Sequence, residues 1–178
     1  MPESGQGTLS AQLTSLLDKV LAAWHALGRA APRLVYVTDA GDHPKKYYQQ
    51  VLRHMADPWR PGQTLAWQWV LDFWHACGYV NKLAEGLFGN VKALGWFRKW
   101  RRWLRDRGQG VANVLRSAMW HYNNGCNRSK ARTKLFWEGY RYLRKYAVWM
   151  KYATYRRRGL PIGSGVTEAP AKPCSRNG

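Results

Sequence analysis

Two short apolar segments, separated by one helical segment, constrain the fold of this 178-residue chain more than any other feature. "RLVYV" (residues 33–37) and "TLAWQWVLDF" (residues 64–73) are rich in β-branched and aromatic residues, which is typical of buried strands. Residues 45–56 between them have apolar side chains at helical spacing, and strands joined by a helix pair in parallel. An apolar stripe over residues 8–27 predicts a further helix before the first strand. We therefore expect an α/β fold, mostly helical, with two parallel strands.

Each predicted strand is followed by a carboxylate. Asp39 comes shortly after the first strand, and Asp72 lies at the end of the second. Because the carboxyl ends of parallel strands meet at one edge of a sheet, we expect the two side chains to share a rim. His75 follows Asp72 by three residues, and there it could bind a metal or transfer protons. The plainer interpretation is that these residues cap or pack at the ends of elements.

The charge of the chain points to a polyanionic partner. Lys and Arg number 29 against 10 Asp and Glu, a formal net charge of +19, which favours nucleic acid. A solvated basic surface and an anionic membrane surface are the alternatives, but no apolar segment approaches the ~20 residues of a membrane-spanning helix. The start of the chain does not have the pattern of a secretory signal, and the three cysteines lack metal-ligand spacing. We expect a cytoplasmic protein with reduced cysteines.

A basic helical region follows the second strand. Residues 78–155 have helical patterning, with one expected break near residues 123–125. In "RKWRRWLRDR" (residues 98–107) the arginines cover one helical face and the tryptophans cover another, where we expect them to pack in a core. Arginine suits phosphate groups, and a second basic segment, "YRRRG", lies at residues 155–159. The predicted DNA-binding residues are Arg98, Lys99, Arg101, Arg102, Arg105, Arg156, Arg157 and Arg158.

A glycine-rich segment near the end of the sequence leads to one more carboxylate. "PIGSGVTEA" (residues 161–169) predicts a turn that opens a helix, with Glu168 close to the helix start. If Glu168 reaches the rim of Asp39, the carboxylates could hold divalent cations for phosphodiester chemistry. A nucleotide-binding P-loop is disfavoured, because the lysine of that motif does not follow the glycines.

Three segments together resemble the transposases of bacterial insertion sequences of the Kra type: "YVTDAGDHPKKYY", "LDFWHA…LAEGLFG" and "YRRRGLPIGSGVTEA". Those transposases are DDE enzymes related to Mutator-like elements, and the resemblance extends over residues 8–169. It implies an RNase H-like core with a helical insertion, Mg²⁺ as cofactor, and cutting and joining of DNA at element ends. It further implies that Asp39 and Glu168 are catalytic metal ligands and that Asp72 and His75 are accessory.

On this resemblance the chain divides into four parts. They are a partial RNase H-like core (residues 8–76), a basic helical insertion (77–158), the turn and start of the helix that carries Glu168 (159–169), and an aberrant tail (170–178).

Two departures from the family pattern affect the expected activity. The family's first catalytic aspartate lies on a strand before the first core helix, and no aspartate precedes Asp39 on a predicted strand. Pro170 and Pro173 follow where the family's helix continues, although proline inside a helix costs ~3 kcal/mol, so we suspect a change of reading frame near Ala169. We expect a transposase fragment, truncated at both ends, that binds DNA and is inactive alone. The alternatives are a non-catalytic, basic helical nucleic-acid-binding protein and a nuclease completed by a partner chain; a homo-oligomer is also possible.

Overall fold

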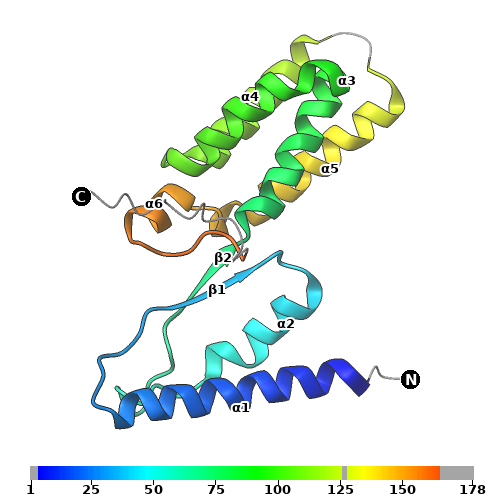
Figure 1. Ribbon diagram of the computed structural model, residues 1–178. Coiled ribbons are helices and arrows are strands. Elements are labelled where there is room, and N and C mark those ends of the chain that lie inside the picture. Colours follow the sequence, from blue (N-terminus) through cyan, green and yellow to red (C-terminus); the bar gives the residue numbers. More distant parts are fainter. Residues whose placement is uncertain (1–3, 126–127, 165–178) are drawn as a thin grey trace, which may run out of the picture.

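The computed structural model describes residues 4–125 and 128–164. Along the chain these residues form α1 (Ser4–Ala26), β1 (Leu34–Thr38), α2 (Asp42–Gln50), the 3₁₀ helix η1 (Leu52–His54), β2 (Trp67–Leu71), α3 (Phe73–Asp106), α4 (Gly110–Asn124), α5 (Lys130–Tyr146), the 3₁₀ helix η2 (Ala147–Trp149) and α6 (Tyr152–Arg157). The described part is mostly helical and contains two strands, as predicted (Figure 1).

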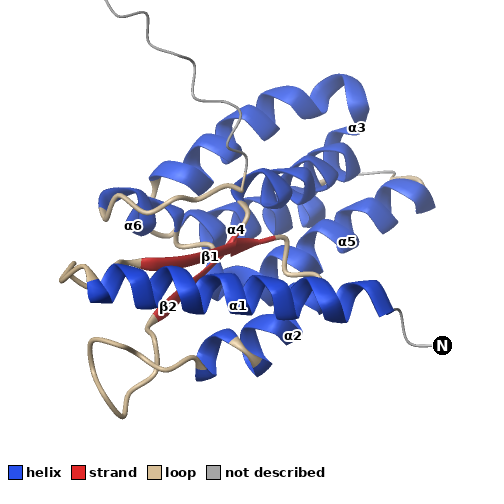
Figure 2. Ribbon diagram, turned by 60° about the horizontal axis from the view of Figure 1, so that its bottom comes forward, coloured by secondary structure: helices blue, strands red, loops and turns tan. Residues whose placement is uncertain are grey.

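The two strands pair in parallel, in register from Leu34 opposite Trp67 to Thr38 opposite Leu71. Helices α1 and α2 lie on one side of the strands, whereas α3 to α6 lie on the other (Figure 1 and Figure 2). The alternation of side chains along the strands fits this arrangement. Leu34 and Trp67 pack with the apolar cluster of α1 and α2, and Val35 packs with the larger cluster of α3 to α6. The parallel pairing expected from the sequence is confirmed.

Three element ends differ from the prediction. Helix α1 begins at Ser4, earlier than residue 8, and α2 ends at Gln50 because the chain continues as a 3₁₀ helix. The second strand is shorter than residues 64–73: Thr64 instead forms an isolated antiparallel bridge with Ala56, and Phe73 already belongs to α3. The expected boundary between residues 76 and 77 therefore lies inside a helix.

Helix α1 packs on the rest of the molecule through a small part of its surface. Among its described side chains Leu21 is buried, at 5% exposure, next to the α2 side of the strands. The Thr14 hydroxyl also contacts the Tyr47 hydroxyl at 3.0 Å. Leu17 is half-buried against the same cluster. Five further large apolar residues of α1 are exposed: Leu9, Leu13, Leu16, Val20 and Trp24. Most of the apolar stripe that predicts this helix therefore does not face the core.

Helix α3 reverses direction at Gly89, which has the backbone angles φ 71° and ψ 166°. In a straight helix, Trp74 and Arg101 would lie about 40 Å apart at 1.5 Å per residue. The Arg101 guanidinium instead lies over the Trp74 ring, 5.9 Å from its centroid. The second part of α3 thus folds back along the first and brings its arginines to the end of β2. The sequence did not predict this reversal, because residues 78–122 were expected to be continuously helical.

Two glycines allow α5 to approach α3 closely. A Cβ atom at Gly86 would lie 2.7 Å from the Phe136 nitrogen, and one at Gly139 would lie 2.7 Å from the Tyr79 carbonyl oxygen. The tryptophans of residues 96–103 pack in this helical body, since Trp100 is buried and Trp96 and Trp103 are half-buried against the core. This confirms their predicted core position.

Candidate nucleic-acid interface

Asp72 is the N-cap of α3. Its Oδ1 accepts hydrogen bonds from the backbone N–H groups of Trp74 at 2.8 Å and His75 at 2.9 Å. Its own N–H donates to the Thr38 carbonyl at 2.8 Å, which fixes the end of β2 beside the end of β1. Free N–H groups at a helix start need such an acceptor, and aspartate is among the preferred residues. The cap interpretation made from the sequence therefore accounts for one of the two carboxylate oxygens.

The second oxygen of Asp72 holds the glycine-rich segment. Oδ2 accepts hydrogen bonds from the Ser164 N–H at 2.6 Å and from the Ser164 hydroxyl. The Phe73 N–H donates to the Ile162 carbonyl at 2.8 Å. Burial acts to raise the pKa of Asp72, but the hydrogen bonds from Ser164, His75 and Trp74 outweigh it, so the pKa lies below its usual value. Residues 162–164 are thereby bound at the carboxyl ends of the strands.

Asp39 lies at the same rim and is exposed. Its Oδ1 accepts hydrogen bonds from the Gly41 N–H at 2.9 Å and from the Thr38 hydroxyl at 3.3 Å. Asp39 and Asp72 line one open hollow of about 610 Å³, together with His75, Trp74 and Ser164. The expectation that Asp39 and Asp72 share a rim is confirmed, and His75 lines the same hollow.

His75 is exposed in this hollow and is held by two tyrosine rings. Its imidazole packs edge-on against Tyr79, with ring centroids 5.4 Å apart, and against Tyr142 at 5.6 Å. The two tyrosines stack on each other at 3.6 Å, and the Tyr142 hydroxyl donates to the Asp39 carbonyl at 2.8 Å. Burial raises the pKa of Tyr142, so this hydroxyl stays protonated as a donor. The aromatic contacts link α3 and α5 to the loop that carries Asp39.

Asp39 and Asp72 differ in how readily their carboxylate oxygens could bind a metal ion. Both oxygens of Asp72 already accept hydrogen bonds that hold backbone, so a metal bound there would displace the cap or Ser164. Within the part of the chain that the structure describes, the hydrogen bonds to the carboxylate of Asp39 both reach Oδ1, so Oδ2 is the oxygen that could bind a cation. Among residues 4–125 and 128–164, no group of three or more His, Cys, Asp and Glu side chains is arranged to hold a metal ion. Glu168, the other predicted ligand, lies outside the described residues.

Four predicted DNA-binding arginines form one surface on the folded-back part of α3. Arg98, Arg101, Arg102 and Arg105 line a small polar hollow of about 210 Å³ beside Phe73. The predicted arginine face is therefore present. Lys99 points elsewhere, over the Trp100 ring at 5.2 Å from its centroid. Guanidinium groups spaced along one helical face suit the oxygens of a phosphate backbone.

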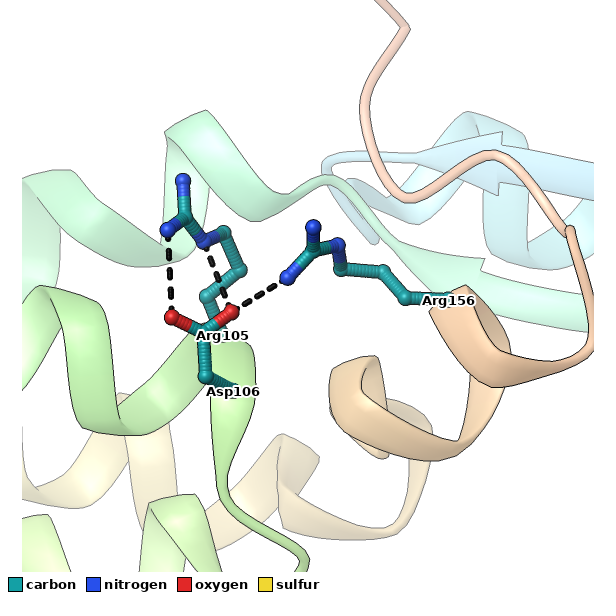
Figure 3. Close-up of polar contacts among 3 residues, drawn as sticks. All are labelled: Arg105, Asp106 and Arg156. Atoms are coloured by element: carbon teal, nitrogen blue, oxygen red, sulfur yellow. Dashed lines mark hydrogen bonds and ion pairs between the residues drawn. The ribbon is translucent and has the colours of Figure 1, made fainter.

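The second predicted basic segment lies next to this surface. Asp106 forms ion pairs with Arg105, at 2.9 Å, and with Arg156 of α6, as Figure 3 shows. The carbonyl of Arg158 accepts a hydrogen bond from Arg33 at 2.6 Å, which ties the end of α6 to the start of β1. The side chains of residues 156–158 are exposed. Both basic segments named from the sequence therefore lie together, with one acidic residue between them.

Trp74 connects the arginine surface to the carboxylate rim, and the sequence reasoning missed it. Its indole lines the hollow of Asp39 and Asp72, carries Arg101 over one side, and is 52% exposed. The sequence has eleven tryptophans, so the residue type alone does not single out Trp74. The available signal was its position, two residues after a capping carboxylate and one before His75.

No protein-family model, curated protein or solved structure matches this chain. Within the described ranges, none of the helices combines the length and the apolar character that crossing a membrane requires.

Proposed function

We propose that the chain belongs to a DNA transposase of the DDE type, which acts on insertion-sequence DNA and holds the DNA backbone on the arginines of α3 and α6. The observation that carries this proposal is the position of the arginine hollow beside the carboxylate rim, with Trp74 shared between them. Two parallel strands with helices on both sides are compatible with part of an RNase H-like core, the fold that the resemblance implies.

The residues divide the work in this proposal. The arginines neutralise backbone phosphates and fix the duplex relative to the rim. Asp72 positions residues 162–164, so that the chain leading to Glu168 starts from the rim. Asp39 and Glu168 would hold Mg²⁺, which when bound would activate a hydroxyl and stabilise a leaving oxygen. Residues 1–178 contain no counterpart of the family's first catalytic aspartate, so we expect these residues alone to bind DNA without transferring strands.

DNA binding is tested by the salt dependence of affinity, measured by fluorescence anisotropy with a labelled duplex. Each phosphate contact contributes about −0.9 to the slope of log K against log salt concentration. Arg98→Gln combined with Arg102→Gln should therefore make the slope shallower by about 1 to 2. Lys19→Gln is the matched control, because Lys19 is exposed on α1, on the opposite side of the strands. An unchanged slope in the double variant would contradict the proposed surface.

One observation favours a second candidate, a basic helical nucleic-acid-binding protein without catalysis. Both oxygens of Asp72 serve the backbone, so the carboxylate of this residue is explained by folding alone. The two candidates differ in a Mg²⁺-dependent strand-transfer assay on element ends, with the complementing transposase chain added. Activity that is lost in both Asp39→Asn and Glu168→Gln supports the transposase. DNA binding without Mg²⁺-dependent activity in any mixture supports the second candidate.

A further inference from the structure

We propose that Trp74 is a stacking platform for an unpaired nucleobase, so that the rim receives DNA whose strands are locally separated. This inference rests on the proposed DNA-binding function and adds a base-binding site to the phosphate-binding surface. The resemblance assigns a role to Asp72 and His75 but none to the tryptophan between them.

The indole packs against neighbouring groups while much of its surface stays open. Trp74 lies in the first turn of α3, where its backbone N–H donates a hydrogen bond to Asp72 Oδ1. The Phe73 ring packs on it edge-on at 5.3 Å, and Gly163 lies close enough that an added Cβ would be 3.1 Å from its Cδ1 atom. A side chain fixed in this way loses little further conformational freedom when it binds a ligand. Its exposed fraction of 52% is thus available surface on a preorganised aromatic ring.

The surroundings of Trp74 suit a base better than a second phosphate. Arg101 lies against the indole on one side, where it can neutralise the phosphate that flanks a bound base. The hollow that Trp74 lines also presents the Asp39 carboxylate, which repels phosphate but accepts hydrogen bonds from the amino groups of bases. His75 adds a second polar edge in the same hollow. Phosphate-binding and base-binding groups are therefore adjacent but separate.

A base pair in the interior of a duplex cannot use this platform. There both faces of each base are covered by neighbouring bases, and an indole can stack only on a face that has been uncovered. Stacking of a base on an aromatic side chain is worth about tenfold in affinity or more, and it tolerates any base because every base has a π-face. The preference should therefore be for unpaired structure rather than for sequence.

The test compares the affinity of the full chain for a blunt duplex and for the same duplex with a short single-stranded tail that carries 2-aminopurine. The wild type should bind the tailed DNA about tenfold more tightly, with quenching of the 2-aminopurine fluorescence on stacking. Trp74→Ala should bring the ratio of the two affinities close to one and abolish the quenching, and Trp74→Phe should retain most of both. Trp120→Ala is the matched control, because Trp120 is 61% exposed on α4 and does not line the hollow at the rim.

The outcomes separate this inference from the proposed function. If Trp74→Ala keeps the preference for tailed DNA, or if the wild type binds both DNAs equally, the stacking platform is refuted and duplex binding stands. If Trp120→Ala loses the preference as well, the effect belongs to exposed tryptophans in general and the assignment to Trp74 fails. If the wild type binds neither DNA, both proposals are wrong. Circular dichroism and thermal unfolding show whether each variant is folded, and the Phe variant keeps the test decisive if the Ala variant is not.

Discussion

Replacement of Asp72 by alanine should destabilise the protein by roughly 2–3 kcal/mol. Loss of an N-cap costs about 1 kcal/mol, and the cap here serves both the Trp74 and His75 N–H groups. The two donors of Ser164 also lose their acceptor, which adds about 1 kcal/mol or more where they stay dry. In a chain of this size, 1 kcal/mol corresponds to about 2–4 °C in Tm, so the expected decrease is roughly 4–12 °C.

A matched set of variants separates the two roles of this carboxylate. Asp72→Asn keeps an acceptor for the helix start but presents an amide to Ser164, so it should destabilise the protein about half as much as Asp72→Ala does. Ser164→Ala should remove the hydroxyl contact alone. Asp42→Ala is the control, because Asp42 is exposed in the first turn of α2, where the cap makes no side-chain hydrogen bond, and it should cost less than about 1 kcal/mol.

The pH dependence gives an independent check with a definite sign. The pKa of Asp72 is lowered in the folded state, so its contribution is present above the unfolded value of about 4 and is lost as the pH falls through the folded-state pKa. Urea unfolding at several pH values should therefore show a gap between wild type and Asp72→Ala that is constant near neutral pH and narrows as the pH falls below about 4. An Ala variant as stable as wild type at pH 7, or a gap that does not narrow in acid, would refute the assigned role.

Two further stability predictions follow from the packing. Gly139→Ala should lower the free energy of unfolding by about 1–3 kcal/mol in urea, because its Cβ would lie 2.7 Å from the Tyr79 carbonyl oxygen. Gly95→Ala is the control, because the described residues leave open space around Gly95; it should be neutral or stabilising by up to about 1 kcal/mol. Leu21→Ala should cost about 2–4 kcal/mol, because Leu21 is only 5% exposed. Leu16→Ala on the same helix should change stability by less than about 0.5 kcal/mol, because Leu16 is 58% exposed. Equal losses would mean that α1 is covered by a partner.

The paired strands could be predicted because local and long-range requirements agree there. Val35 and Trp69 belong to short apolar segments, and a single intervening helix leaves parallel pairing as the simple way to bury both. The rim of Asp39 and Asp72 follows from that pairing without further information. This part of the site therefore depends on the strand pattern and on nothing that lies far away in the sequence.

The reversal of α3 could not be predicted, because helical periodicity does not say which glycine ends a helix. Gly86, Gly89 and Gly95 all lie within a stretch of helical pattern. Close contact of Gly86 with α5 keeps it inside the helix, and Gly89 is the residue that adopts a positive φ. That choice depends on contacts with a helix about 50 residues away. The same limit applies to the bond between Asp72 and Ser164, which joins residues 92 positions apart.

The positive charge of the chain is concentrated in its helical part, and the reversal of α3 places some of that charge next to the rim. Residues 1–76 contain seven Lys and Arg and six Asp and Glu, whereas residues 77–178 contain twenty-two Lys and Arg and four Asp and Glu. A polyanion is therefore attracted to the helical part and not to the strands. Without the reversal at Gly89, the arginines of residues 98–105 would project away from the rim, and DNA bound to them would not reach Asp39. Because α3 folds back, Arg101 lies at the boundary between the basic part and the nearly neutral part, against Trp74. A phosphate brought to this boundary meets positive charge from Arg101 and negative charge from the carboxylates of the rim. In the proposed function, Mg²⁺ bound at Asp39 would offset that repulsion as the phosphate approaches.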